Sequence, residues 1–487
     1  MKSKFKNINK LSFEVPKDLK AELREYQKFG YNWLKTLEHL GLGGILGDEM
    51  GLGKTLQAIT FILSNKGKKT LIVAPTSLIY NWKEEFNKFA PNLVVEVLNE
   101  GKDKREEALR DIESKDVIIT TYNLLKRDLE EYKKINFDYC FIDEAQAIKN
   151  PDSQNSEAVK EVNSEYKFAL TGTPMENSLM ELWSIFDFVM PGYLYDRKRF
   201  TVRYYNKLNE SEEVLNEIHS LIKPFILRRK KKDVIKELPD KIEKMHLVDL
   251  GEEQKKVYSI YANNALSIME KKQDAEEFNK SKIEILSYIT KLRQLALDPS
   301  VTINDYMGES AKIEALVEIL NQGIEEGHKI LVFSQFTSVL KNISSRLKEE
   351  KISFSYLDGS VSSKKRINMV NEFNEGENSV FLISLKAGGT GLNLTSADIV
   401  IHFDPWWNPA VENQATDRAH RMGQKNVVEI IKLIAKGTIE EKVVALQEEK
   451  KELISKIIEE GELGAGSTFN SLSEEELMDL FKVDYLG

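Results

Sequence analysis

The chain has 487 residues, 41% of them hydrophobic and 30% charged, with a formal net charge of −9, a composition typical of soluble globular domains and unlike that of a basic protein that coats nucleic acid. Its length favours two or more domains, and no apolar run approaches the roughly 20 residues that cross a bilayer, which excludes membrane spans. The lysine-rich start lacks the apolar core of a secretory signal and the single cysteine, Cys140, leaves no intrachain disulfide, so we expect a cytoplasmic protein (nucleoid-associated in a prokaryote, nuclear in a eukaryote).

Between positions 42 and 170 short apolar runs alternate with amphipathic stretches, as in an open α/β sheet. The predicted buried strands span 43–46, 70–74, 116–120, 139–142 and 167–170. Polar or turn-forming residues follow each run. Because ligands of such sheets bind at the carboxyl ends of the strands, the segments after these runs form the predicted site.

The segment GDEMGLGKT, residues 47–55, follows the first predicted strand and precedes a helix expected at 56–63. Its glycines let backbone N–H groups face an anion, its lysine reaches the β- and γ-phosphates, and its threonine hydroxyl suits Mg²⁺. The predicted nucleotide ligands are Asp48, Met50, Gly51, Leu52, Gly53, Lys54 and Thr55. Asp48 stands where the strict pattern has its first glycine, so an ordinary glycine-rich turn is the alternative.

Two carboxylates, Asp143 and Glu144, follow the strand expected at 139–142. An acid downstream of a phosphate-binding loop usually completes the coordination of Mg²⁺, often through water, and its neighbour can deprotonate the attacking water. The alternative is that both acids only cap the next helix. Together with the loop they favour a catalytic set of Lys54, Asp143 and Glu144.

The strand pattern mostly stops between positions 175 and 321, where 254–277 and 283–297 are predicted to be amphipathic helices. Strand-like runs resume at 329–333, 354–357, 380–384, 399–403 and 427–433. The pattern predicts two α/β lobes separated by a helical insert. In the second lobe, Arg418 and Arg421 are predicted to share a helical face that suits a transferring phosphoryl group; a helix salt-bridged to Asp417 and Glu412 is the alternative.

Eight motifs in this order resemble the Swi/Snf group of superfamily 2 helicase-like ATPases. They are LREYQ (23–27), DEMGLGKT (48–55), DEAQAIKN (143–150), LTGTP (170–174), ILVFSQFT (330–337), LKAGGTGLNL (385–394), DPWWNP (404–409) and DRAHRMGQ (417–424). The segment PFILRRKKKDV (224–234), followed by LPDK, also resembles a signature of this group. The resemblance implies an α/β fold with two RecA-like lobes, each a mostly parallel sheet flanked by helices, and helical insertions between them. Asp48 in place of glycine is usual in the group.

The resemblance also implies a division of the chain. The expected parts are a basic lead-in (1–20), an ATP-binding lobe with a helical protrusion (21–222), a Swi/Snf-specific linker and protrusion (223–310), a second lobe (311–445) and a helical tail (446–487). We expect a minimal core of prokaryotic type, preceded by further sequence before Met1 and ending naturally near 473–481.

Further residue roles follow from the resemblance alone. Gln27 would bind the adenine, and Gln414, Arg418 and Arg421 would close on the γ-phosphate. Arg24 and Gly391 would also bind ATP. Gln146, where DEAH-type members have His, would hydrogen-bond to the segment of Thr171 and Thr173 and couple ATP to DNA. The implied DNA contacts are Pro75, Thr76, Ser77, Trp82, Thr121, Tyr122, Arg228, Lys230, Ser334, Gln335, Lys386, Gly388, Gly389, Thr390, Trp406 and Trp407. For Trp406 and Trp407, packing in the core is an equal alternative. Residues 228–232 are expected to form a helix edge that faces phosphate rather than a nuclear localisation signal.

The predicted protein is therefore a monomeric motor that uses ATP and Mg²⁺ to move along double-stranded DNA without obligatory strand separation. A DNA-bound protein is its expected cargo. Two alternatives remain at this point: a helicase acting on RNA or single strands, and a nucleotide-gated DNA clamp with vestigial turnover.

Overall fold

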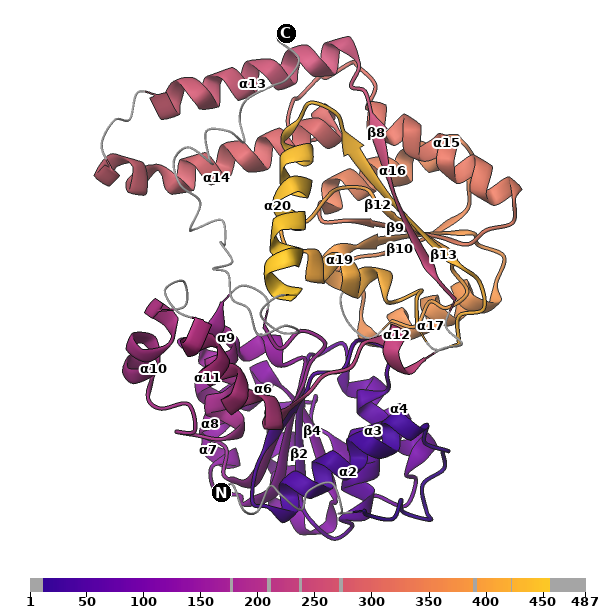
Figure 1. Ribbon diagram of the computed structural model, residues 1–487. Coiled ribbons are helices and arrows are strands. Elements are labelled where there is room, and N and C mark those ends of the chain that lie inside the picture. The colour runs from indigo at the N-terminus through magenta and orange to yellow at the C-terminus, as the bar shows by residue number, and fades with distance from the viewer. Residues whose placement is uncertain are drawn as a thin grey trace. The chain divides into compact units, whose positions relative to one another are not determined.

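The computed structural model describes residues 12–175, 178–207, 212–235, 239–270, 275–388, 392–421 and 423–455 (Figure 1). The chain forms two compact units whose main division falls between Glu237 and Leu238. Each unit contains one sheet of parallel strands flanked by helices. The expected α/β fold with two RecA-like lobes is confirmed.

The sheet of the first lobe has seven strands in the order β3-β4-β2-β5-β6-β1-β7. They are β1 (Gly44–Leu46), β2 (Thr70–Ala74), β3 (Val95–Val97), β4 (Val117–Thr121), β5 (Phe137–Asp143), β6 (Ser164–Leu170) and β7 (Ile226–Leu227). All six pairings are parallel, so the carboxyl ends of the strands meet at one edge. The five strands predicted in this lobe are present, whereas β3 and β7 are too short to produce an apolar pattern.

Helices cover both faces of this sheet, whose strands β2 and β4 are buried along their whole length. The helices are α2 (Glu25–His39), α3 (Lys54–Ser64), α4 (Ile79–Phe89), α5 (Lys102–Arg110), α6 (Tyr122–Arg127), α7 (Leu129–Tyr132), α8 (Gln154–Lys160), α9 (Leu179–Val189), α10 (Arg197–Arg203), α11 (Glu212–Ile222) and α12 (Lys231–Val234). Phe61 of α3 packs edge-on against Tyr139 and Phe168 of the sheet, with ring centroids 5.1 and 5.3 Å away. This packing fixes α3, whose first residues lie at the end of the phosphate-binding loop.

The sheet of the second lobe has six parallel strands in the order β10-β11-β9-β12-β13-β8. The strands are β8 (Lys241–Val248), β9 (Ile330–Ser334), β10 (Phe354–Leu357), β11 (Val380–Ser384), β12 (Ile399–His402) and β13 (Val428–Ala435). The helices are α13 (Glu252–Glu270), α14 (Ala275–Leu297), α15 (Ala311–Glu325), α16 (Thr337–Glu349), α17 (Ser363–Glu375), α18 (Leu385–Gly388), α19 (Pro409–Thr416) and α20 (Ile439–Ser455). The predicted insert helices correspond to α13 and α14, which lie side by side and extend away from the sheet (Figure 1).

The segment from 223 to 310 does not form a separate linker as predicted. Its first part, β7 and α12, belongs to the first lobe, and its remainder, from β8 to α14, belongs to the second. The strand β8 was missed because it lies at the sheet edge with all residues but Val248 exposed, and its lysines and glutamates interrupt any apolar run. The predicted lead-in is also partly structural, because Phe13 and Leu19 pack on the core of the first lobe.

None of the helices in the part of the chain that the structure describes is long and apolar enough to cross a membrane. The parts of the predicted tail and lead-in at 456–487 and 1–11 lie outside the described residues. In each lobe the carboxyl ends of the parallel strands meet at one edge of the sheet, and this edge positions the candidate site residues.

Candidate nucleotide-binding site

The phosphate-binding loop joins β1 to α3 and turns back on itself at two glycines. Gly51 and Gly53 have φ values of 87° and 74°, a left-handed conformation that residues with side chains rarely adopt. Lys54 is the first residue of α3, and its Nζ donates to the carbonyl oxygen of Asp48 at 2.7 Å. The loop thus wraps around a cation at a helix N-terminus, which is an arrangement suited to bind phosphate.

The side chain of Asp48 is fully buried behind this loop, where it pairs with Arg229. Arg229 donates from Nε to Oδ1 at 2.8 Å and from Nη2 to Oδ2, and Gln57 Nε2 lies 3.3 Å from Oδ2. The carboxylate therefore serves the loop, and a nucleotide contact by Asp48 is left to its backbone. Sequence reasoning missed Arg229, although an acid in place of a loop glycine is a signal that a buried cation must lie nearby.

The segment that follows β7 runs beside the loop. Gly47 N–H donates to the Leu227 carbonyl at 2.7 Å, and Glu49 N–H donates to the Arg229 carbonyl at 3.0 Å. Only Lys231–Val234 is helical, and Lys231 is buried. The expected helix edge over 228–232 is present only at Lys231 and Lys232, because Arg229 hydrogen-bonds to the loop and residues 228–230 precede the helix. Contact of Arg228 and Lys230 with DNA remains a prediction.

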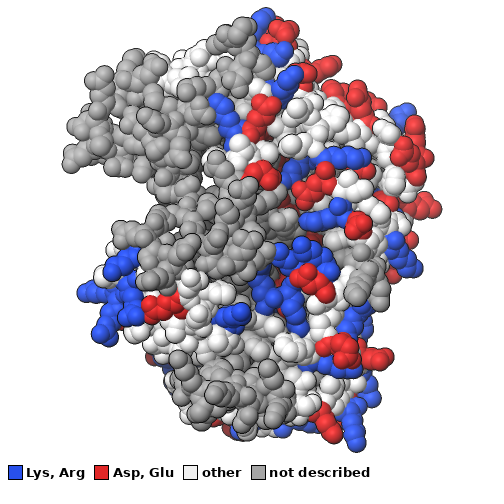
Figure 2. Space-filling view, viewed as in Figure 1, with Lys and Arg blue, Asp and Glu red and all other residues white. Residues whose placement is uncertain are grey.

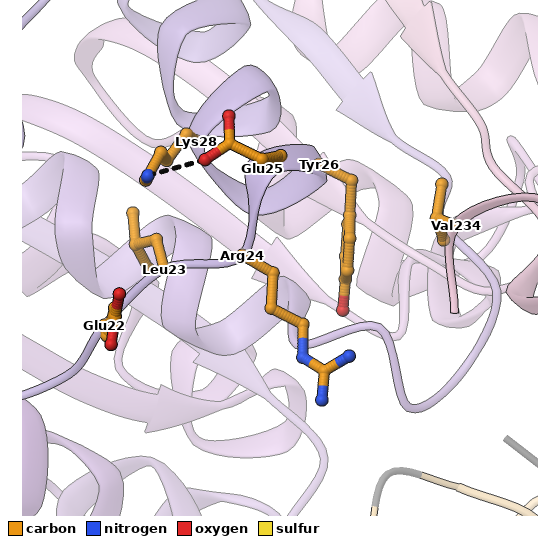
Figure 3. A pocket seen from close by; sticks show the side chains of 7 residues that line it. All are labelled: Glu22, Leu23, Arg24, Glu25, Tyr26, Lys28 and Val234. Carbon is orange, nitrogen blue, oxygen red and sulfur yellow. Dashed lines mark hydrogen bonds and ion pairs between the residues drawn. The ribbon is translucent and has the colours of Figure 1, made fainter. Parts of the chain in front are cut away.

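A pocket of about 620 Å³ lies at the start of α2. It is lined by Glu22, Leu23, Arg24, Glu25, Tyr26, Lys28 and Val234 (Figure 3). Arg24 and Tyr26 extend in the same direction from the start of the helix, whereas Glu25 and Lys28 pair with each other. Gln27 is buried, accepts from Arg24 N–H at 3.0 Å and donates to the Leu52 carbonyl at 3.3 Å. It therefore ties this pocket to the phosphate-binding loop, and its role with adenine remains a prediction.

Asp143 ends β5, and donors from three directions fix it. Trp82 Nε1 donates to Oδ2 at 2.9 Å, Glu144 N–H donates to Oδ1 at 2.8 Å, and the Tyr122 hydroxyl donates to the main-chain carbonyl at 2.7 Å. Burial, and then the negative charge of Glu144, raises the pKa of Asp143 to about 7. A nearby cation would stabilise the ionised form of this buried carboxylate. Each of its oxygens accepts one of the hydrogen bonds above and has a second lone pair that could bind the cation.

Three predicted DNA contacts in this lobe, Trp82, Tyr122 and Thr121, are corrected by burial and hydrogen bonding. Trp82 and Tyr122 are 2% and 5% exposed, so neither faces a ligand on the surface. Thr121 is also buried and caps α6 by accepting from Leu124 N–H at 3.1 Å. The reason is that the first turns of α4 and α6 place Trp82 and Tyr122 against the end of β5, where both bond Asp143. The segment 75–77, with Thr76 exposed, remains the predicted DNA contact.

Glu144 has φ = 49°, a strained conformation for a residue with a side chain. Its Oε2 accepts from Gln146 Nε2 at 2.7 Å, and Gln146 Oε1 accepts from the Thr171 hydroxyl at 3.1 Å. Thr173 N–H donates to the same hydroxyl at 3.1 Å. The predicted hydrogen bond from Gln146 to the 171–173 segment is present. Glu144 has no capping hydrogen bond to the short helix that follows, so the capping alternative loses support.

The two arginines of the second lobe do not share a helical face, which corrects the prediction. The helix α19 ends at Thr416, and the Arg418 carbonyl accepts from Leu394 N–H at 2.9 Å, which draws the backbone out of the helix. Arg418 is 3% exposed and donates from Nε to the Gln414 carbonyl at 3.1 Å. Arg421 is less buried and donates to the Leu392 carbonyl at 3.3 Å.

The predicted DNA loops of the second lobe are held by Arg293 of α14. Its Nη1 donates to Gln335 Oε1 at 3.2 Å, its Nη2 donates to the Pro405 carbonyl, and its guanidinium lies 5.5 Å from the Trp407 ring. Gln335 also donates to Asp404 at 2.6 Å. Trp406 and Trp407 pack against hydrophobic clusters, in agreement with the core-packing alternative. Ser334 and Gly388 are buried and Lys386 is exposed, while Gly389, Thr390 and Gly391 lie outside the described residues.

Charges of both signs are interspersed on the face shown in Figure 2, with one cluster of Lys and Arg over α10. Arg197, Lys198, Arg199 and Arg203 contribute to it. Arg197 pairs with Asp152 and Arg203 with Glu217, at 2.5 and 2.6 Å. Sequence reasoning did not single out this surface.

No group of three or more His, Cys, Asp or Glu side chains suited to a metal ion occurs among the described residues. Mg²⁺ does not require one, since it is usually bound by one or two protein ligands together with substrate phosphates and water. The Thr55 hydroxyl and the buried Asp143 carboxylate fit this donor set.

Comparison with known proteins agrees with these features. Residues 26–301 match the model of the SNF2-related domain, and residues 311–423 match the helicase conserved C-terminal domain. A putative ATP-dependent helicase/translocase of Bacillus subtilis is 39% identical over 96% of this chain and 52% of its own length. The TATA-binding protein-associated factor MOT1 of Saccharomyces cerevisiae is 33% identical over 97% of this chain and 29% of its own length.

Among solved structures, the SWI2/SNF2 ATPase core of Sulfolobus solfataricus in complex with dsDNA is 37% identical, with 97% of this chain and 99% of that chain aligned and a TM-score of 0.47. The chain spans about half the length of the bacterial curated relatives that it matches. The SNF2-related model alone covers more than half of the chain, from the α2 pocket through the phosphate-binding loop to α14. The chain therefore belongs to the SNF2-related family of ATP-dependent enzymes.

Proposed function

We propose that the chain is a DNA-stimulated ATPase that translocates along double-stranded DNA and displaces or remodels a DNA-bound protein, without obligatory strand separation. The observation that carries the proposal is that hydrogen bonds anchor both neighbouring acids, Asp143 and Glu144. Asp143 is anchored to Trp82 and Tyr122, and Glu144 is anchored through Gln146 to Thr171. Both anchors come from segments that follow other strands of the same sheet. An ATPase whose rate depends on a second ligand needs links of this kind.

The nucleotide chemistry follows from the groups around the loop. Lys54 and the N–H groups between Gly51 and Thr55 bind the phosphates, and the α2 pocket beside Arg24 and Tyr26 takes the base. Thr55 and Asp143 would hold Mg²⁺, which would supply positive charge to neutralise the phosphates. Glu144 orients the attacking water and accepts its proton, with Gln146 fixing the carboxylate.

In the second lobe we propose that Arg421 acts on the γ-phosphate, because an arginine can stabilise the charge of a transferring phosphoryl group. Arg418 is more deeply buried than Arg421, and its side chain bonds the Gln414 carbonyl, which favours a structural role. This assigns the two arginines different roles, where the sequence had given them one.

Protein cargo is supported by MOT1, whose name describes a factor associated with the TATA-binding protein. Translocation is supported by the bacterial relative named as a helicase/translocase. The bacterial name also favours one second candidate, a helicase that separates strands. The basic cluster over α10 supports contact with a polyanion but does not distinguish these two.

Two assays test the proposal. ATP turnover is measured with saturating duplex DNA, single-stranded DNA and RNA, and we expect the largest stimulation with duplex. Displacement of a third strand from a DNA triplex then reports movement along the duplex, and displacement of one strand of a forked duplex reports unwinding. Triplex displacement with ATP, without fork unwinding, is the expected result. Fork unwinding would establish the helicase, and duplex binding without turnover would establish the clamp.

A further inference from the structure

We propose that Trp82 and Tyr122 are positioning residues that transmit duplex engagement at the first lobe to the Asp143 carboxylate. The inference rests on the proposed function, since it assumes that duplex DNA stimulates hydrolysis. It assigns to two side chains, expected from the sequence to touch DNA, a role behind the DNA surface. The hydrogen bonds, burial and chain connectivity of α4 and α6 support it.

The two side chains hold different parts of the same residue. Trp82 Nε1 donates to the carboxylate of Asp143 at 2.9 Å, whereas the Tyr122 hydroxyl donates to its main-chain carbonyl at 2.7 Å. Together they fix both the carboxylate orientation and the peptide at the end of β5. A small displacement of either donor would therefore rotate or shift the group that we expect to hold Mg²⁺.

Trp82 is directly connected to the strand end that carries the predicted DNA contact, and Tyr122 follows the end of the neighbouring strand β4, where Thr121 pairs with Ala74 of β2. Trp82 lies in the first turn of α4, which begins at Ile79 immediately after the segment 75–77, and Leu78 N–H donates to the Pro75 carbonyl at 2.8 Å. Tyr122 is the first residue of α6, directly after β4. Because helices and strands are stiff, a shift of either strand end on binding DNA moves its donor.

The packing of each side chain depends on its ring rather than on the atom that donates the hydrogen bond. The indole of Trp82 packs against Phe86 with ring centroids 6.0 Å apart, a contact that phenylalanine at position 82 can keep in part. The Tyr122 ring is buried, and phenylalanine at this position keeps the ring and loses only the hydroxyl that bonds Asp143. Tyr122→Phe therefore removes the hydrogen bond and keeps the ring, whereas Trp82→Phe also removes part of the buried indole and needs a tryptophan control.

The test compares Trp82→Phe and Tyr122→Phe with two matched controls in the same lobe. Trp183→Phe removes a buried indole donor that bonds the Tyr195 carbonyl at 3.2 Å. Tyr193→Phe removes a hydroxyl that bonds the Leu221 carbonyl at 3.0 Å. For the full chain and each variant, ATP turnover is measured with and without saturating duplex, together with the KM for ATP, the Kd for duplex and the thermal unfolding midpoint.

We expect each of the two variants to lower the duplex-stimulated kcat relative to the basal kcat by about tenfold, while the Kd for duplex stays within about twofold. The two controls keep the wild-type ratio. Equal loss of basal and stimulated rates, or a ratio equal to that of the controls, would overturn the inference. If one variant does not fold, the other decides, because the two act on different atoms of Asp143.

Failure of the proposed function is recognised separately. A wild-type chain whose turnover is not raised by duplex refutes the proposed function before any variant is compared. A wild-type chain that is stimulated, with Trp82→Phe and Tyr122→Phe equally stimulated, leaves the proposed function intact and refutes the positioning role alone.

Discussion

Arg229 and Asp48, which lie 181 positions apart in the sequence, form a two-point ion pair behind the phosphate-binding loop. Their relationship explains why this loop carries an acid where the strict pattern has glycine: the acid is the anchor for an arginine that arrives after β7. The loop is thus held both by its own helix and by a segment from the end of the first lobe.

Replacing Arg229 with Met should destabilise the first lobe by about 3–5 kcal/mol, because it leaves a buried carboxylate unpaired. Urea titration and the KM for ATP measure the effect, with the exposed Lys232→Met as control. The pair Asp48→Gly and Arg229→Met removes both charges and restores the strict glycine, so it should recover much of the loss. A single variant within about 1 kcal/mol of wild type would contradict the anchoring role.

Glu144→Gln should bind ATP with an unchanged KM and hydrolyse it about 10²- to 10⁴-fold more slowly, because the amide cannot accept the proton of the attacking water. Rapid-mixing measurements of bound ATP and released phosphate separate the two steps. Glu130→Gln, at an exposed position of α7, serves as the control. Full turnover in Glu144→Gln would remove this residue from the general-base role.

Arg418→Ala and Arg421→Ala should fail in different ways. The Arg418 variant loses a buried side chain that bonds the Gln414 carbonyl, so it should lower the unfolding midpoint of the second lobe. The Arg421 variant should keep its stability and bind ATP but lose roughly 10³-fold or more in stimulated kcat. Full duplex-stimulated turnover in Arg421→Ala would refute its action on the γ-phosphate.

Acid should weaken the second lobe through His402. Burial lowers the pKa of this histidine below its ordinary 6.5, so the unfolded chain takes up the proton more readily than the folded chain. The free energy of unfolding is therefore fully retained above pH 6.5 and falls as the pH drops from 6.5 toward the folded pKa. Urea titrations between about pH 5 and 8 measure the slope.

His402→Gln should flatten that slope. His328→Gln should steepen it, because the hydrogen bond to Asp398 raises the pKa of His328 and so stabilises the folded chain at low pH. Parallel slopes in wild type and His402→Gln would show that another group dominates the acid response.

The basic cluster over α10 should contribute to duplex affinity without sequence preference. Lys198 and Arg199 are exposed there. If both contact phosphate, Lys198→Ala with Arg199→Ala should reduce the slope of log Kd against log salt by about 2. Arg197, which pairs with Asp152, serves as the comparison site. An unchanged salt slope in the double variant of Lys198 and Arg199 would show that this surface does not contact DNA.

Most of the fold follows from periodicity, since buried parallel strands such as β2 and β11 are continuous apolar runs. The loop, Asp143 and Glu144 could be placed from their motifs and positions at strand ends. Trp82 could not, because a tryptophan near a DNA motif has the same sequence pattern whether it points outward or to a carboxylate. Arg229 was missed because its partner Asp48 is distant in the sequence, and β8 was missed because an exposed edge strand has no apolar run.

The stretch from Phe225 to Val248, which includes most of the signature, has a practical consequence. It supplies the outermost strand of each sheet, β7 to the first and β8 to the second, and it also supplies the arginine that neutralises Asp48. A fragment of the first lobe that stops at 222 would be expressed with a buried charge uncompensated and a sheet edge uncovered. Fragments for expression should therefore end after Val234, and those of the second lobe should begin before Lys241.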